Sequence, residues 1–249
     1  MVLICGSRVT MPSLVNQRFS EWTAGLDVHH SMTSIFYHIR DIPYSIVSGS
    51  RFHDALCAGE LLLENGRGFC APKHYLLAEM YKRLNVPVVF ATFPFLWNDP
   101  KIRYPPELRK LASGLPVAYH LACRVQIGCR WVLVDATWDP PLGSVGFPVN
   151  EYWDGYADTR CAVTPLKAPV RTAFCRTLKN EPYRAPGEAE LNPADGEKNH
   201  WEVDDRENYY RGRISRRSPE EKEQAARFYQ EFDSWLERVR NLTVGAGSA

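Results

Sequence analysis

The sequence has almost no net charge: among its 249 residues, 30 Lys and Arg side chains balance 29 Asp and Glu, leaving +1 at pH 7. A chain without excess positive charge has no general attraction to nucleic acid or to an anionic membrane surface. It also lacks an apolar run long enough to span a bilayer, and the apolar part of Met1 to Arg8 is too short for a signal peptide. We therefore expect a cytoplasmic protein that binds neither nucleic acid nor membrane.

The seven cysteines form no CxxC pair and no other compact metal-binding spacing, and no internal repeat is present. Free thiols in a reducing compartment are the expected state, although Cys123 and Cys129 could approach each other across a turn. His29 and His30 are adjacent but have no cysteine or histidine partners at zinc spacing. We expect no metal and no cofactor.

One cysteine lies in a distinctive setting. Gly66 and Gly68 precede Cys70, and Pro72 follows it, which suits a tight turn leading into the first turn of a helix. Apolar residues then recur at helical spacing until Asn85-Val86-Pro87 ends the run: Leu76, Leu77, Met80, Tyr81 and Leu84. At a helix N-terminus the free amide N–H groups favour a reactive thiolate at Cys70, whereas a lone cysteine is more often a small buried hydrophobe.

Residues 117–127 and 131–138 alternate as two strands of a hairpin. A turn at Gly128-Cys129 places Asp135 opposite Ala122, with His120 as its diagonal neighbour. A turn one residue earlier places His120 directly opposite Asp135, and either register puts both on one face. The alternatives are a core histidine and an aspartate that forms a turn.

These segments resemble the core domain of the transglutaminase-like superfamily, papain-related cysteine enzymes, and in particular its uncharacterised prokaryotic members. The resemblance rests on Gly68-Phe69-Cys70-Ala71-Pro72-Lys73, His120, residues 131–140 and the opening segment 35–44, and it covers roughly residues 30–165. It implies an α+β, papain-like fold, in which a helical part carrying Cys70 packs on an antiparallel sheet carrying His120 and Asp135.

The resemblance also implies roles. Cys70 matches the nucleophile, His120 the general base and acid, and Asp135 the residue that orients the imidazole. The Cys70 N–H is one candidate oxyanion donor. Papain-like enzymes use a glutamine upstream of the cysteine as the second, and Asn65 is the candidate here.

The expected reaction is acyl transfer from a peptide or other amide through a thioester, with hydrolysis (peptidase or deamidase) favoured because no additional β-rich domains follow. An amide-forming transferase with an amine acceptor and a catalytically silent binding module remain alternatives. Gly68, Phe69 and Trp138 are candidates for the substrate groove. Further aromatic residues flank the site segments and either line this groove or pack in the core: Phe93, Phe95, Trp97, Tyr152, Trp153 and Tyr156.

We divide the chain into an N-terminal extension (1–29), a catalytic domain (30–180), a polar connecting segment (181–217) and a C-terminal helix with its tail (218–249). Residues 181–249 carry −4 and residues 1–180 carry +5, which favours acidic or neutral substrates. The basic run 211–217 is interpreted as a solvated patch, and 162–166 as an edge strand limited by its proline.

The C-terminal helix, 218–241, begins with Ser218, Pro219 and Glu221, a capping box. Its apolar residues form one stripe: Ala225, Phe228, Phe232, Trp235 and Val239. We expect the stripe to dock on the protein's own domain, with a partner chain or a homo-oligomer interface as the alternative, and the tail 243–249 to fray.

Overall fold

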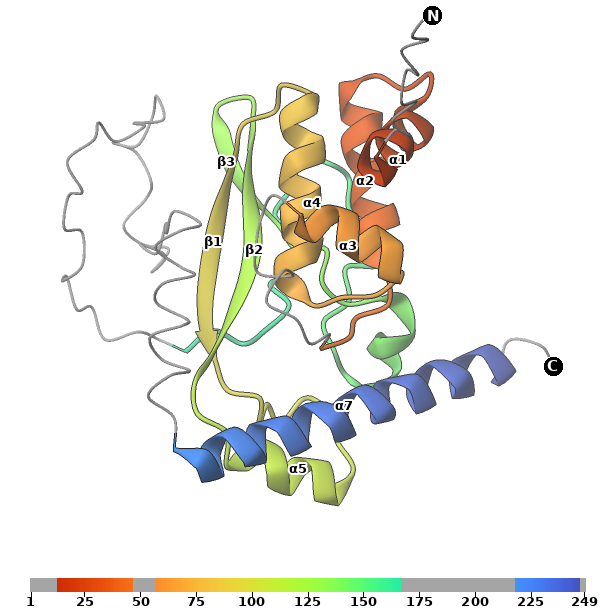
Figure 1. Ribbon diagram of the computed structural model, residues 1–249. Helices are drawn as coiled ribbons and strands as arrows, with labels where there is room; N and C mark the ends of the chain where they lie inside the picture. The colour runs from red at the N-terminus through yellow and green to blue at the C-terminus, as the bar shows by residue number, and fades with distance from the viewer. Residues whose placement is uncertain (1–12, 47–56, 167–217, 247–249) are drawn as a thin grey trace, which may run out of the picture.

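The computed structural model describes residues 13–46, 57–166 and 218–246. Within these ranges the protein is α+β: a small antiparallel sheet with helices packed beside it and a long helix across one end (Figure 1). The elements, in chain order, are α1 (Leu14–Thr23), α2 (Val28–Asp41), α3 (Ala58–Asn65), α4 (Cys70–Arg83), β1 (Val88–Phe95), α5 (Pro106–Ser113), β2 (Ala118–Ile127), β3 (Arg130–Val134), the 3-10 helix η2 (Pro140–Val145) and α7 (Pro219–Ala246).

The hairpin of β2 and β3 has the first of the two predicted registers. Ile127 pairs with Arg130, and Gly128 occupies the first turn position with φ of 60°. Because that φ is positive, glycine is the natural residue there. β3 is shorter than the predicted 131–138, since the Asp135 N–H donates to the Thr159 hydroxyl instead of continuing the ladder.

Strand β1 was not predicted, and it completes the sheet in the order β1-β2-β3. Its Phe93 pairs with His120 of β2. Pro94 is tolerated because β1 is an edge strand. The predicted strand 162–166 is wrong: Ala162 donates its N–H to the Asp135 carboxylate, and Leu166 makes a single backbone bond to Pro94.

One core lies between the sheet and α1, α2 and α4. Val15 of α1 and Trp153 are buried in it together with apolar residues of α2, α4, β2 and β3. Helix α1, predicted as part of an extension, therefore packs as part of this same core. The N-cap of α2 is Asp27, whose carboxylate accepts from the His30 N–H at 2.8 Å.

Helix α7 docks on the protein's own fold, as expected. Its predicted apolar stripe is buried in a second cluster with residues from β1, η2 and the loops between them: Phe95, Trp97, Ile102, Trp138, Leu142 and Phe147. The capping box is confirmed, because Ser218 Oγ accepts from the Glu221 N–H at 3.2 Å and Glu221 accepts from the Ser218 N–H at 2.9 Å. The helix continues to Ala246, beyond the predicted end at 241.

Polar contacts fix the same helix. Arg240 forms a bidentate pair with Asp139 at 2.8 and 2.9 Å, and Asp233 accepts from the Ser45 hydroxyl and the Ile46 N–H. The predicted connecting segment 181–217, including the basic run 211–217, lies outside the described residues. None of the helices in the described ranges is both long and apolar enough to cross a membrane.

Candidate active site

Cys70 is the first residue of α4 and is half-buried. The N-cap, Phe69, has an extended backbone and makes no side-chain cap hydrogen bond. Gly68 directly before it pairs with the segment after α2: its N–H donates to Pro43 and its carbonyl accepts from Ser45, both at 3.1 Å. A Cβ at Gly68 would lie 2.6 Å from the Leu62 side chain, so this glycine permits close packing of its own chain.

His120 and Asp135 lie in contact in the interior. His120 Nε2 is 2.8 Å from Asp135 Oδ2, and both side chains are at most 3% exposed. The imidazole also hydrogen-bonds the Cys70 side chain. Since Nε2 faces Asp135, Nδ1 is the nitrogen left to serve the thiol.

His120 and Asp135 each stabilise the charged form of the other. Burial disfavours protonation of His120, but the Asp135 carboxylate and the hydrogen bonds with Asp135 and Cys70 outweigh it and raise the pKa of His120 well above its usual value. Burial likewise opposes ionisation of Asp135, yet His120 and the Thr137 hydroxyl, 2.6 Å away, lower its pKa to about 2. The Ala162 N–H, at 2.7 Å, provides a further donor to the carboxylate. Asp135 is therefore a fixed anion beside the imidazole.

His74, to which the sequence analysis assigned no role, links α4 to the end of β3. Its Nδ1 lies 2.8 Å from the Cys70 carbonyl oxygen, and its Nε2 accepts from the Ala136 N–H at 3.1 Å. These partners require the neutral tautomer with the proton on Nδ1. Burial lowers the pKa of His74 to about 4, in agreement with a neutral ring, although Asp135 Oδ1 lies 3.6 Å from Nε2.

Lys73, named in the sequence only as part of the Cys70 segment, also holds this region together. Its fully buried Nζ donates to three carbonyl oxygens, of Arg40 at 3.0 Å, Ile42 at 2.8 Å and Thr137 at 2.7 Å. Burial lowers the pKa of Lys73 to about 7, while Asp139, Asp41 and Asp135 oppose that shift. Three donors matched to three acceptors tie α4 to the end of α2 and to the chain after β3.

A signal for both residues exists in the sequence. Apolar residues surround positions 73 and 74 in the predicted helix, and α4 is buried on nearly every side. A polar side chain inside a helix that is apolar all round must be buried and therefore hydrogen-bonded.

The other predicted site residues have different surroundings. Asn65 lies exposed at the end of α3, and its Nδ2 donates to Leu61 at 2.7 Å, so its amide is held within α3 and this contact gives no support for an oxyanion donor. Phe69 is partly buried against the aromatic cluster under α7. Trp138 is buried, donates to the Ala162 carbonyl at 2.6 Å and lines a cavity.

One set of potential metal ligands occurs in the described part of the chain. A nitrogen of His120, an oxygen of Asp135 and the thiol of Cys161 lie within 4.8 Å of one another. A metal ion there would have to compete with three hydrogen bonds to Asp135, from His120, Ala162 and Thr137. In this arrangement Asp135 is already used to hydrogen-bond the His120 imidazole.

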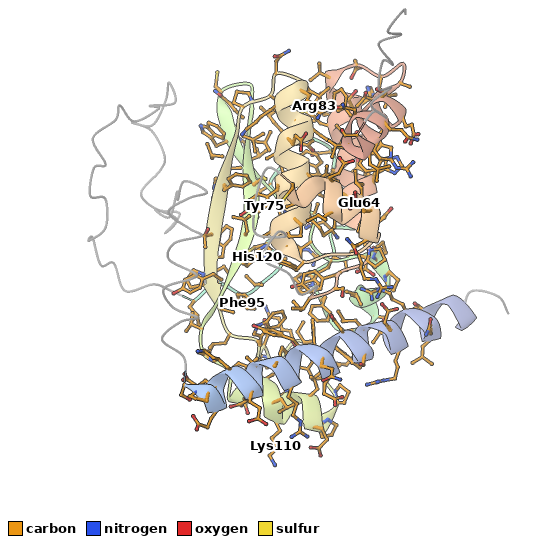
Figure 2. All side chains as sticks on the ribbon, viewed as in Figure 1. Glu64, Tyr75, Arg83, Phe95, Lys110 and His120 are labelled. Atoms are coloured by element: carbon orange, nitrogen blue, oxygen red, sulfur yellow. The ribbon has the colours of Figure 1, made fainter. Side chains whose placement is uncertain are left out.

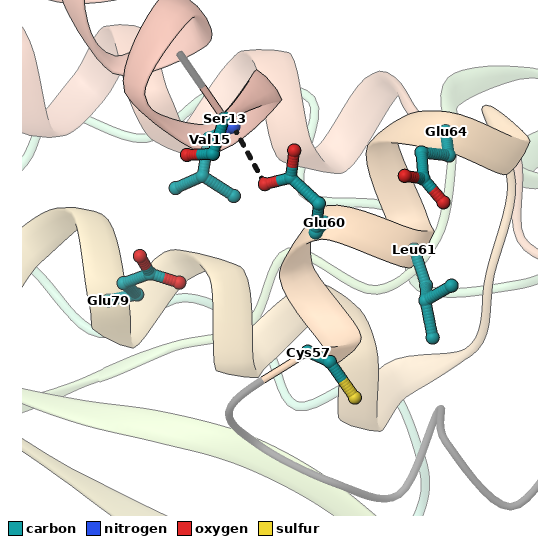
Figure 3. Close-up of a pocket in the computed structure, with 7 residues that line it drawn as sticks. All are labelled: Ser13, Val15, Cys57, Glu60, Leu61, Glu64 and Glu79. Atoms are coloured by element: carbon teal, nitrogen blue, oxygen red, sulfur yellow. Dashed lines mark hydrogen bonds between the residues drawn. The ribbon is translucent and has the colours of Figure 1, made fainter. Parts of the chain in front are cut away.

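A separate hollow of about 420 Å³ lies among α1, α3 and α4 (Figure 3). Glu60 points into it and accepts from the Val15 N–H at 3.2 Å, next to a second bond from Leu14, so its carboxylate caps the start of α1. Its lining contains none of the three predicted catalytic residues: Ser13, Val15, Cys57, Glu60, Leu61, Glu64 and Glu79. It is a helix junction, distinct from the candidate site.

No protein-family model matches this sequence, and no curated protein is similar enough to count as a match. Among solved structures, a candidate cysteine protease from Cytophaga hutchinsonii is similar with a TM-score of 0.36 and 18% sequence identity. The match covers 53% of this chain and 39% of that one, so it spans about two fifths of that protein's length. A superposition at this level does not define a shared fold.

Proposed function

We propose that this protein is a cysteine hydrolase of the transglutaminase-like, papain-related type, which cleaves a peptide or another amide through a thioester. One observation carries the proposal. A buried imidazole, paired with a carboxylate at 2.8 Å, hydrogen-bonds a half-buried cysteine that begins a helix. Nucleophile, base and orienting group are the three parts that acyl transfer by a thiol requires.

The reaction begins with transfer of the Cys70 proton to His120, which Asp135 favours by stabilising the imidazolium. The thiolate attacks the substrate carbonyl, and the Cys70 N–H stabilises the oxyanion. As the C–N bond breaks, the amine leaves with the proton from His120, and a thioester remains on Cys70. Water, deprotonated by His120, then attacks the thioester, which releases the carboxylic acid and restores the thiol.

We favour hydrolysis over transfer to an amine on the family resemblance alone. A cytoplasmic location and a peptide or small amide as substrate belong to the same proposal.

The test is turnover of a pooled peptide and amide library by the full chain, read by mass spectrometry, together with detection of a hydroxylamine-sensitive acyl adduct on Cys70. Cys70→Ala is expected to abolish turnover with little change in thermal stability, because this side chain is half-buried. Turnover that survives the substitution would remove Cys70 from the mechanism. Cys129→Ala, at an exposed thiol in the hairpin turn, is the matched control and should leave turnover unchanged.

A further inference from the structure

A cavity of about 480 Å³ lies beside the proposed catalytic residues. Figure 2 shows Phe95, one of its lining residues, farther than His120 toward the end of the sheet that faces α7. Its wall includes six large, mostly aromatic side chains: Phe95, Trp97, Ile102, Tyr104, Trp138 and Phe147. This volume falls within the usual range for sites that bind small molecules.

The cavity adjoins the His120–Asp135 pair. Cys161 lines it, and its Sγ is within 4.8 Å of a ring nitrogen of His120 and a carboxylate oxygen of Asp135. Ala162, also in the wall, donates its N–H to Asp135. Phe69, directly before Cys70, packs against the aromatic cluster that contributes these six large side chains to the wall. A group held near the imidazole can therefore extend into this cavity.

The residues that line the cavity carry more positive than negative charge. Lys101 and Arg160 are exposed cations, and neither forms an ion pair with any of the described residues. Asp99 is the one carboxylate among the lining residues, and its oxygens accept from the Lys101 backbone N–H and the Thr164 hydroxyl. The lining is thus positive overall and favours a ligand that carries an acidic group.

We propose that this cavity binds an aromatic side chain of the acyl donor, next to an acidic residue that Lys101 and Arg160 attract. This assignment rests on the proposed function, because an acyl donor presupposes the thioester on Cys70. Aromatic walls favour an aromatic occupant, since edge-to-face and offset ring pairs stabilise a complex beyond the area they bury.

The experiment compares reagents that alkylate Cys70 in the full chain. Iodoacetamide, which has no side chain, reports the reactivity of the thiol itself. Acetyl-Glu-Phe and acetyl-Glu-Ala chloromethyl ketones differ only in the side chain offered to the cavity; in each, the thiolate forms an S–C bond and chloride leaves. Burial of a phenyl side chain should make the Phe reagent about 10- to 100-fold faster than the Ala reagent.

Two pairs of variants locate the effect. Val163→Trp fills the cavity and should abolish the Phe preference without changing the iodoacetamide rate. The control Val28→Trp, at an exposed position of α2, should retain the Phe preference. Acetyl-Lys-Phe chloromethyl ketone should react severalfold more slowly than its Glu counterpart. Arg160→Glu should reverse that order, and Lys110→Glu, exposed on α5, should not.

The outcomes separate this inference from the proposed function. Equal rates for the Phe and Ala reagents, with an iodoacetamide rate that still depends on His120, overturn the aromatic site and leave the hydrolase proposal standing; a cavity filled by the chain's own residues would give this result. A Phe preference without His120-dependent alkylation contradicts the hydrolase and with it the assignment of the cavity to an acyl donor.

Discussion

Two buried regions of this protein are stabilised in different ways. The junction between α4 and the end of β3 buries the polar side chains of Lys73, His74, His120 and Asp135 and gives each of them hydrogen-bond partners. The layer under α7 buries aromatic rings, with Phe232 in contact with Phe228 and Trp97 at ring-centroid distances of 5.4 and 5.0 Å. Directional bonds fix positions in the first, and buried area provides stability in the second.

The two regions should therefore respond differently to truncation. Loss of one group in the junction leaves buried polar atoms without partners and displaces Cys70. Loss of a ring in the aromatic layer leaves a cavity and lowers stability with the site intact.

Lys73→Met keeps the aliphatic stem but leaves three carbonyl oxygens without their donor. We expect a loss of about 5 kcal/mol in the free energy of unfolding, since each buried acceptor left without its donor costs about 1–3 kcal/mol. Urea denaturation measures it, and Cys70 alkylation should change in the remaining folded protein. Lys82→Met, exposed on the same helix, should be nearly neutral. An equal, small effect for both variants would show that the three bonds do not hold α4.

Phe232→Ala removes a fully buried ring from the aromatic layer. The expected loss is about 4 kcal/mol, the usual range for a buried phenylalanine. The pH profile of Cys70 alkylation, measured where the variant is folded, should match that of the intact protein. Glu231→Ala, its exposed neighbour, serves as the control. A shifted profile would mean that the two buried regions are coupled.

His74 should make the free energy of unfolding depend on pH. Its pKa of about 4 lies below the usual value of 6.5, so the unfolded chain binds the proton more readily between these values. Stability should then fall by about 3 kcal/mol as pH drops from 6.5 to 4, at 1.36 kcal/mol per pKa unit. In His74→Gln, which offers an amide donor and acceptor but does not titrate, this contribution should vanish. An unchanged slope of denaturation midpoint against pH would contradict the neutral, buried ring.

Ser218→Ala removes the N-cap of α7. The expected cost is about 1 kcal/mol, measured by thermal denaturation, with no change at Cys70. Ser234→Ala, exposed within the same helix, is the control and should have a smaller effect. A cost equal to that of Phe232→Ala would indicate that the start of α7, rather than its aromatic stripe, holds the helix in place.

The sequence predicted those features that local rules determine. Gly128 needs a positive φ, Ser218 and Glu221 form a reciprocal cap, and Cys70 begins a helix; each depends on residues a few positions apart. The same-face placement of His120 and Asp135 followed from strand alternation.

The features that were missed depend on contacts between distant segments. Lys73 reaches Arg40 and Thr137, and His74 reaches Ala136, which are partners that periodicity within α4 does not reveal. The predicted strand 162–166 failed because the Ala162 N–H binds the Asp135 side chain instead of a neighbouring strand. Asn65, chosen by its distance in sequence from Cys70, is held by its own helix.

The proposed reaction depends on activation of Cys70 by His120, and the pH dependence of Cys70 alkylation measures that activation. Mass spectrometry would follow labelling in the intact chain and in His120→Ala, with the other six cysteines as internal standards. We predict fast labelling that persists well below the ordinary thiol pKa of about 8.5 and is lost without His120. Slow labelling like that of the other cysteines, unchanged in His120→Ala, would contradict the proposed enzyme and favour a catalytically silent binding module.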